Sequence, residues 1–450
     1  MADSRISVAR NDRKVVRGWY MYDWANSVYS LVITSAIFPI YYKAVANTNG
    51  SDIISFMGFS IQNSNLYSYA LSFSFLIVAM IVPLLSGVAD YSGSKKTFMA
   101  FFVWLGGLSC MSLFFFTDVS TLWLGIVFSI FASIGYSGSL VFYDAFLPEI
   151  VTEDRFDATS ANGYSMGYYG SVLMMVLCMV LIMNYEFFLF SSEIEAMRVS
   201  FVLVGAWWIG FSFIPLRVLP HNPFGVQPSG NVWTKGYQEI RKVWRNLGNQ
   251  PDLKRFLFAY FFYNMGVQTV MYLSALFGTD VLRLEASKLI LTMLIIQLVG
   301  AFGAFVFARF SAKKGNKVAL LSMIVIWVGV CIAAYFITTE YQFYALATIV
   351  GLVMGGIQSL SRATYAKLIP RDTIDHASYF SFYDVTFYLS VVFGTFSYGL
   401  INQLTGSMRF SALGLAVYFI VGMAFLISIR SKNIVRKAES SVERTHTIVN

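Results

Sequence analysis

The stretch GWYMYDWANSVYSLVITSAIFPIYY, residues 18–42, decides the fold class of this 450-residue chain. It is long and apolar enough to cross a bilayer, which takes about 20 mostly apolar residues, yet it carries a carboxylate, Asp23. A charge within a span costs at least about 2.5 kcal/mol and usually faces a bundle interior or a wet cavity. We therefore expect a helix of a polytopic bundle that turns Asp23 away from lipid.

The composition of the whole chain agrees with a membrane protein. Hydrophobic residues make up 57% of the sequence and charged residues 12%, whereas soluble domains carry about 25% charged residues. Twelve apolar runs are long enough to span, so we predict an all-α membrane protein with 12 transmembrane helices. The predicted spans are residues 20–42, 65–89, 97–116, 120–142, 161–184, 198–219, 254–278, 287–309, 318–337, 341–362, 377–401 and 408–429.

The charged residues between these runs predict the orientation. If the N-terminus is cytoplasmic, the cytoplasmic segments hold 27 Lys and Arg, and the external loops hold five. This asymmetry follows the positive-inside rule. We expect a multi-pass protein of a prokaryotic cell (inner) membrane with both termini cytoplasmic. The net charge of +8 then lies along one membrane face and does not indicate nucleic-acid binding.

Signatures of cofactors and catalysis are missing from the sequence. The three cysteines lie singly in apolar runs and the three histidines are scattered, so neither a disulfide framework nor a metal site is expected. The sequence contains no GxxxxGK[ST] phosphate loop, which argues against direct use of ATP. We expect no cofactor, no metal and no enzymatic activity, and a chain that functions as a monomer.

The two halves of the chain resemble each other. At an offset of 222 residues SGSKKTF falls on KKGNKVA and YDAFLPE falls on YAKLIPR, so Gly93 matches Gly315 and Pro148 matches Pro370. We expect two six-helix halves of one topology, as in transporters built from parallel repeats. The predicted domains are an N-terminal half, 1–219, a cytoplasmic linker, 220–253, a C-terminal half, 254–429, and a cytoplasmic tail, 430–450.

Two connecting segments carry unusual patterns. The linker places apolar residues at 3- and 4-residue spacing with Lys and Arg between them, which favours an amphipathic helix on the cytoplasmic leaflet; a flexible linker is the alternative. The loop 143–160 is acidic among basic loops, which indicates either ion pairing between loops or a solvated loop. The residues are Trp233, Tyr237, Ile240, Trp244 and Leu247 in the linker, and Asp144, Glu149, Glu153, Asp154 and Asp157 in the loop.

Polar residues form a stripe on the first span. Asp23, Asn26, Ser30 and Thr34 recur at i, i+3, i+7 and i+11, which places them on one helix face. At an offset of 238 residues Asn26 falls on Asn264, and a matching stripe of the seventh span continues through Gln268 and Tyr272. We expect both stripes to face a common polar cavity.

The sequence SGVADYSGSKK, residues 86–96, resembles the loop between spans 2 and 3 of the major facilitator superfamily. Asp90, Gly93 and Lys95 match the usual form, whereas Ser94 replaces a basic residue. In the second copy Ala312 stands at the Asp90 position. The resemblance implies that the acid docks on the other half and holds the cytoplasmic side closed. The expected gate residues are Asp90, Gly93, Lys95 and Lys96.

More narrowly, YDWANSVYSLVITSAIFPIYY and GGIQSLSRATYAKLIP, residues 355–370, are similar to the branch named for the autophagy-related vacuolar amino-acid effluxer. The matches cover nearly the whole chain. They imply alternating access, with spans 1, 4, 7 and 10 lining a cavity for a small solute, and amino-acid efflux as the first activity. From the residues alone sugars, peptides or drugs are equally open, and a non-transporting receptor or assembly protein is the competing class.

Several cavity candidates have an alternative structural reading. Asp23 is either a cavity residue or a cap of its helix, and Arg362 either binds a carboxylate or anchors its helix at the cytoplasmic interface. Asp384, the deepest acid, is either a proton carrier or part of an ion pair; Asp23 and Asp384 are the candidates for proton coupling. The full predicted cavity set is Asp23, Asn26, Ser30, Thr34, Tyr263, Asn264, Gln268, Tyr272, Gln358 and Arg362.

Small-residue faces and a few aromatic residues complete the expectations. Gly163, Gly167 and Gly170 on span 5, and Gly300, Gly303 and Ala304 on span 8, let helices approach closely. These faces either meet between the halves or pack within one half. Besides Tyr263, the aromatic residues expected to touch substrate are Tyr22, Trp24 and Tyr365.

Overall fold

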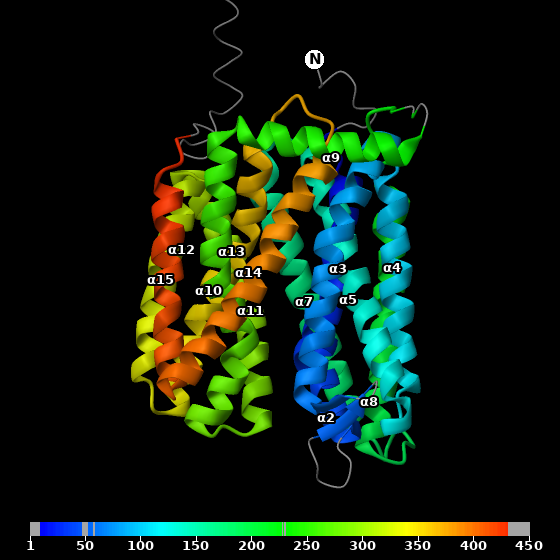
Figure 1. Cartoon of the computed structure of the whole chain (residues 1–450), viewed down its shortest axis with the longest axis vertical. Coiled ribbons are helices and arrows are strands. Elements are labelled where there is room, and N and C mark those ends of the chain that lie inside the picture. The colour runs from blue at the N-terminus through cyan, green and yellow to red at the C-terminus, as the bar shows by residue number, and fades with distance from the viewer. Residues whose placement is uncertain (1–9, 47–52, 57–58, 227, 229–230, 431–450) are drawn as a thin grey trace, which may run out of the picture.

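The chain folds as a bundle of long helices that run side by side, with one further helix lying across one end of the bundle (Figure 1). The computed structural model describes residues 10–46, 53–56, 59–226, 228 and 231–430. Eleven of the described helical segments are long and apolar enough to cross a membrane. Helix α10, with 32 residues, stands among them (Figure 1). The predicted all-α membrane fold with twelve spans is confirmed.

The first six spans, the first half hereafter, occupy one side of the bundle (Figure 1). In the loop after the first span, β1 and β2 pair antiparallel with Ile53 opposite Gln62. The elements are α1 (Arg13–Val28), η2 (Tyr29–Ile37), α2 (Phe38–Ala46), β1 (Ile53–Phe56), β2 (Phe59–Gln62), α3 (Asn63–Ser92), α4 (Lys95–Ser112), η3 (Leu113–Phe115), η4 (Val119–Thr121), α5 (Leu122–Ala145), α6 (Leu147–Ile150), η5 (Glu153–Arg155), α7 (Phe156–Met183) and α8 (Glu193–Val218).

The last six spans, the second half, occupy the other side (Figure 1). Between the halves, α9 crosses one end of the bundle, which we call the α9 face; the opposite end is the far face. The elements are α9 (Val232–Gly248), α10 (Pro251–Leu282), α11 (Ala286–Lys314), α12 (Asn316–Phe336), α13 (Glu340–Leu368), α14 (His376–Thr405) and α15 (Met408–Ile427).

The internal repeat is visible in the backbone. Gly93, between α3 and α4, has φ +67°, and Gly315, between α11 and α12, has φ +86°. Both values lie in the region that glycine adopts without steric cost. The two residues that match at the 222-residue offset therefore make the corresponding tight turns of the two halves.

The first span is not a uniform α-helix. Its middle, η2, is π-helical from Tyr29 to Ile37, and the Ser35 hydroxyl donates to the Ser30 carbonyl at 2.8 Å. π-Helical turns inside α-helices are frequently found at functional sites. The helical spacing predicted the stripe on this span but not this local widening, which coincides with the cavity described below.

Helices α7 and α11 meet across the two halves. Ala161 packs against Ala304 and Ala308, and the Ser165 hydroxyl donates to the Ala301 carbonyl at 3.0 Å. Most of the glycines in the predicted small-residue faces pack against helices of their own half instead. A Cβ on Gly163, Gly167 or Gly170 would strike residues of α1, and one on Gly303 would strike the backbone of α13. A Cβ on Gly300 would meet both Tyr168 of α7 and the backbone of α13.

Helix α9 binds the first half through a very close backbone approach. A Cβ on Gly87 of α3 would lie 2.3 Å from the Gly236 carbonyl oxygen. Val243 and Leu247 are buried, whereas the aromatic residues of the predicted apolar stripe remain exposed. Aromatic side chains are enriched at membrane–water interfaces, which suits a helix lying at the edge of the bundle. The exposed residues are Trp233, Tyr237 and Trp244.

The same helix also contacts the second half. The Lys242 amine lies 2.9 Å from the carboxylates of both Glu239 and Asp375, and the rings of Trp244 and Phe382 are 5.6 Å apart. Partial burial would lower the pKa of Lys242, but the hydrogen bonds to Glu239 and Asp375 outweigh it and raise the pKa above its usual value. Helix α9 thus bridges the two halves.

Candidate functional site

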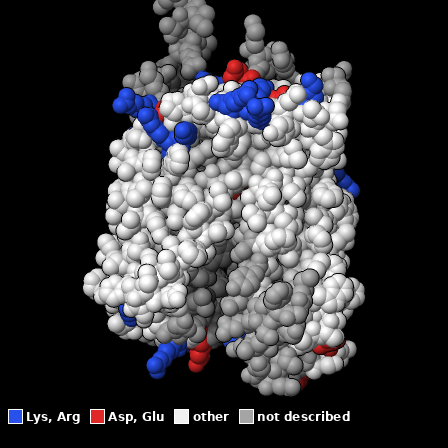
Figure 2. Space-filling model, viewed as in Figure 1, with Lys and Arg blue, Asp and Glu red and all other residues white. Residues whose placement is uncertain are grey.

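A cavity of about 210 Å³ lies between the two halves, with walls from α1, η2, α3, α5, α7, α10, α11, α13 and α14. At one end it includes Ser35 of η2, which is exposed. Figure 2 shows the surface hollowed between the halves on the side away from α9, whereas Lys and Arg gather near α9. The cavity therefore opens toward the far face.

The residues of both predicted stripes line this cavity. The α10 side is ordered by hydrogen bonds: the Gln268 amide donates to the Asn264 carbonyl oxygen at 3.2 Å, and the Asn264 amide donates to the Ser390 hydroxyl at 2.6 Å. The side chain of Tyr272 lies outside the described residues. The predicted residues on the cavity wall are Asp23, Asn26, Ser30, Thr34, Tyr263, Asn264, Gln268, Gln358 and Arg362.

Arg362 of α13 joins the two halves at the α9 end of the cavity. Its guanidinium lies 3.3 Å from the Asp23 carboxylate and 2.9 Å from the Asp144 carboxylate. It also donates to the hydroxyl and the carbonyl of Ser160 at 2.9 and 3.0 Å. The residue is 1% exposed, so the reading of Arg362 as an anchor at the membrane interface is wrong. Its planar fork instead binds two carboxylates of the other half.

Asp23 does not cap its helix. The N-cap is Asp12, which accepts from the backbone N–H groups of Lys14 and Val15 at 2.7 and 3.3 Å. Helix α1 begins at Arg13, so Asp23 lies well beyond the first turn, where free backbone N–H groups are found. The Tyr143 hydroxyl donates to its carboxylate at 2.7 Å. The capping reading of Asp23 is therefore wrong, because the helix starts earlier than the apolar run.

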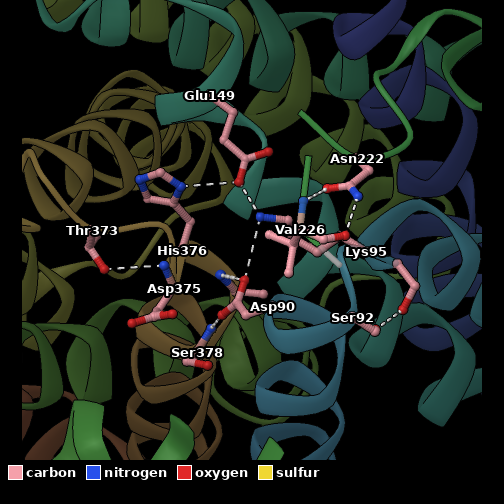
Figure 3. Close-up of polar contacts among 12 residues, drawn as sticks. Asp90, Ser92, Lys95, Glu149, Asn222, Val226, Thr373, Asp375, His376 and Ser378 are labelled. Carbon is pink, nitrogen blue, oxygen red and sulfur yellow. Dashed lines mark hydrogen bonds and ion pairs between the residues drawn. The ribbon is translucent and has the colours of Figure 1, made fainter. Parts of the chain in front are cut away.

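A second contact between the halves involves Asp90, at the end of α3 (Figure 3). Its carboxylate accepts from the backbone N–H groups of Ala377 and Ser378 at 3.2 and 2.7 Å. These groups belong to the first turn of α14, where backbone donors are free and the helix dipole favours an anion. Lys95 lies between Asp90, at 3.4 Å, and Glu149, with which it forms an ion pair.

Glu149 extends this contact to His376, whose ring nitrogen lies 3.1 Å from the carboxylate (Figure 3). The other two predicted gate residues contact the first half instead. The Lys96 amine donates to the Leu219 carbonyl at 2.9 Å, and a Cβ on Gly93 would strike Asn222. They therefore fix the α3–α4 turn against the segment that follows α8.

The acidic loop forms ion pairs with the second half, as one of the two readings predicted. Three of its carboxylates lie within 3 Å of a basic group of the other half. Hydrogen bonds between charged groups are stronger than those between neutral groups, whereas the exposed pair of Glu153 with Arg371 contributes little. The pairs are Asp144 with Arg362, Glu153 with Arg371, and Asp157 with Lys367.

Asp157, in the first turn of α7, is the centre of a third contact between the halves, in which the hydrogen bonds from Ser311 and Asn316 were not predicted from the sequence. Its carboxylate lies 2.8 Å from the Lys367 amine and accepts from Ser311 at 2.9 Å and from the Asn316 amide at 2.7 Å. All three partners belong to the second half. The internal repeat offered a signal, because Ser311 adjoins Ala312, the residue that matches Asp90.

The aromatic candidates divide between cavity and core. The Tyr263 hydroxyl shares a 2.7 Å hydrogen bond with Ser361 on the cavity wall. Tyr22 and Tyr365 are fully buried, and the ring of Trp24 stacks 5.3 Å from that of Trp207; none of these three belongs to the described lining. Sequence reasoning missed other cavity tyrosines, because aromatic residues give no periodic signal in an apolar helix. They are Tyr29, Tyr136, Tyr164, Tyr168, Tyr260, Tyr383 and Tyr388.

Asp384 of α14 lines the same cavity. It is 8% exposed, and its Oδ2 atom accepts no hydrogen bond from any residue that the structure describes. An unpaired carboxylate in such a place is costly unless a partner reaches it. Of the two readings of Asp384, the ion pair is not formed with any basic residue that the structure describes.

This geometry, two six-helix halves around a polar cavity, has close counterparts among known proteins. The sequence model of a family described as "Vacuole effluxer Atg22 like" matches residues 11–439. The chain belongs to this Atg22-like family. It is also 32% identical over 415 residues to the uncharacterized MFS-type transporter YxiO of Bacillus subtilis, covering 92% of this chain and 94% of that one.

More distant relatives of this Atg22-like chain agree. Autophagy-related protein 22-1 of Aspergillus niger is 23% identical over 552 residues, covering 92% of this chain and 88% of that one. The crystal structure of the MFS transporter FucP in the outward conformation superposes with a TM-score of 0.68 at 12% identity, covering 93% of this chain and 98% of that one. The last likeness shows the fold, and together with the family it makes this chain a transporter of the major facilitator type.

Proposed function

We propose that this transporter carries a small polar organic solute through the central cavity by alternating access, with amino-acid efflux as the first activity to test. The observation that supports the proposal most is the cavity itself. It is polar, lies between two repeated halves, opens to one face, and is separated from the other face by buried contacts between the halves. The description of the family as an effluxer suggests the direction of transport.

The α9 face is proposed to be cytoplasmic, because the positive-inside rule places the basic loops there. The structure then corresponds to an outward-open state. The cytoplasmic gate in this proposal consists of Asp90 with Lys95 and Glu149, and of Asp157 with its three partners. Both contacts separate when the halves rock, and solvation or new partners must replace them.

Proton coupling is proposed to involve Asp384 before Asp23. The Asp23 carboxylate is already engaged through its Oδ2 atom by Arg362 and Tyr143, and both contacts stabilise its charged form. Asp384 lines the cavity, and its Oδ2 atom has no hydrogen-bond partner among the residues that the structure describes. A proton or a cationic group that enters from the far face can therefore bind to Asp384 without breaking a contact.

Counterflow in proteoliposomes tests the proposed function. Vesicles preloaded with one amino acid, sugar or peptide at high concentration are diluted into the same labelled solute, with and without a proton gradient. We expect transient accumulation of at least one solute, and its loss in the Arg362→Ala variant. An empty result across the whole panel would contradict transport of these classes. Dependence on the gradient that persists in Asp384→Asn would contradict the coupling role.

A further inference from the structure

The charges on the cavity wall are unbalanced. Among the described residues that line it, the acidic groups are Asp23, Asp144 and Asp384, and Arg362 is the only Lys, Arg or His. A low-dielectric site with more carboxylates than basic groups attracts cations. The wall therefore favours a positively charged group of a substrate over a negatively charged one.

Arg362 is not available to a substrate in this open state. Four hydrogen bonds from its guanidinium go to Asp23, Asp144 and Ser160, and a guanidinium has five N–H groups in total. The ring centroids of Trp19 and Tyr164 lie 4.7 and 4.3 Å from the Cζ atom of Arg362. A substrate carboxylate that enters from the far face thus finds Arg362, the one basic residue of the described lining, already bound to two carboxylates of the protein.

Asp384, in contrast to Arg362, has an oxygen atom that no described residue occupies. It is more than nine-tenths buried, lines the cavity, and keeps Oδ2 without a hydrogen-bond donor among the described residues. Phe387 and Tyr388 follow it at i+3 and i+4 and line the cavity from the same face of α14. The Tyr388 ring stacks on Phe75 of the first half at 5.1 Å. A carboxylate beside aromatic faces is the arrangement that binds ammonium groups.

We propose that the cavity recognises its substrate through an ammonium group at Asp384 and provides no cationic partner for a substrate carboxylate. The substrates are then amines and the ammonium ends of amino acids, and solutes with a blocked amino group are excluded. This inference rests on the proposed transport function and specifies its substrate class. The polar amides of Asn264 and Gln268 on the wall supply neutral hydrogen bonds to the remainder of the solute.

Two measurements on the full-length protein test the proposal. Ligand-induced thermal stabilisation of the purified protein reports binding, and competition against counterflow reports transport. The probes are alanine, valine and phenylalanine, each as the free amino acid, as the amine that lacks the carboxyl group, and as the N-acetyl acid. The variants are Asp384→Asn and, as a matched control on the exposed surface, Asp154→Asn.

We expect at least one amine to stabilise the protein at least as well as its parent amino acid, and the N-acetyl acids to have no effect. Asp384→Asn should weaken binding of the amine about ten- to hundredfold, the effect of losing one charge-assisted hydrogen bond. Asp154→Asn should leave it unchanged. The empty Asp384→Asn protein should melt no lower than wild type, because an unpaired buried charge has been removed; a structural role for Asp384 would lower it.

The outcomes separate this inference from the proposed function. Binding of an amine that depends on Asp384, without exchange of any solute, would contradict transport and retain the ammonium site. Exchange in which N-acetyl acids compete and amines do not would retain transport and overturn the ammonium site. If no amine binds or competes, or if Asp384→Asn binds amines as wild type does, the inference is wrong.

Discussion

Two of the contacts between the halves near the α9 face, the second and the third, occupy corresponding places in the repeated halves, yet their chemistry differs. At the α3–α14 contact, Asp90 accepts from backbone N–H groups at the start of α14. At the α7–α11 contact, Asp157 at the start of α7 accepts from side chains, Ser311 among them. Both acids belong to the first half. The repeat therefore preserved the arrangement of helices while the second copy lost its own acid at Ala312.

The difference has an energetic consequence. The α3–α14 contact buries Asp90, Lys95 and Glu149 almost completely, each at 3% exposure or less. At the α7–α11 contact Lys367, which α13 contributes, keeps 10% of its side chain exposed. Breaking the first contact should therefore leave a charge stranded, whereas breaking the second lets Lys367 be solvated.

The largest expected effect comes from Lys95→Met. The change leaves the carboxylates of Asp90 and Glu149 buried without their shared cation, which should reduce the free energy of unfolding by about 3–5 kcal/mol. Chemical unfolding of the purified protein measures it. The matched control is Lys96→Met, whose amine donates to the Leu219 carbonyl and forms no ion pair within the described part of the chain. Equal stability of the two variants would contradict the central place of Lys95.

Asp90→Ala should act mainly on the conformation. Two hydrogen bonds between the halves are lost, each worth about 1.5–3 kcal/mol when the acceptor is charged, while Lys95 keeps Glu149. We expect the population with an open α9 face to rise at least tenfold. Spin labels on Asp154→Cys and Asp372→Cys, exposed residues of opposite halves, should then report longer distances. Unchanged distances would show that Asp90 does not hold the face closed.

Asp157→Asn should open the same face less. The amide oxygen still accepts from Ser311 or Asn316, and the freed Lys367 reaches water, so we expect a cost of about 1–2 kcal/mol. The same pair of spin labels measures it. The comparison between the contacts fails if Asp157→Asn lengthens the distances more than Asp90→Ala does.

Ala312→Asp is expected to have the smallest effect. It restores an acid at the position that matches Asp90, but Ala312 is exposed, and its neighbour Ser311 is the residue that faces Asp157. A surface change of this kind usually stays within about 0.5 kcal/mol. Chemical unfolding, alone and combined with Asp157→Asn, tests it. Rescue of Asp157→Asn by Ala312→Asp would show that an acid at the position matching Asp90 can also close the face.

Prediction from sequence succeeded where a periodic pattern carried the information. The stripe through Asp23 and Asn26 and its counterpart at Asn264 are spaced by helical geometry, and both line the cavity. The pattern could not show that η2 is π-helical, that Arg362 is already bound by two carboxylates, or that Asp157 faces Ser311. These features depend on residues brought together from distant parts of the chain.

The sequence by itself determined the membrane fold, the twelve spans, the two repeated halves and the family, because hydropathy, charge and helical spacing are local properties that lipid and water select residue by residue. Only the tertiary structure decided which charges are paired. Arg362 lies 339 positions from Asp23 in the chain, and whether a buried carboxylate has a donor within 3 Å depends on how the two halves pack. That packing leaves Asp384 unpartnered within the described chain and facing the cavity.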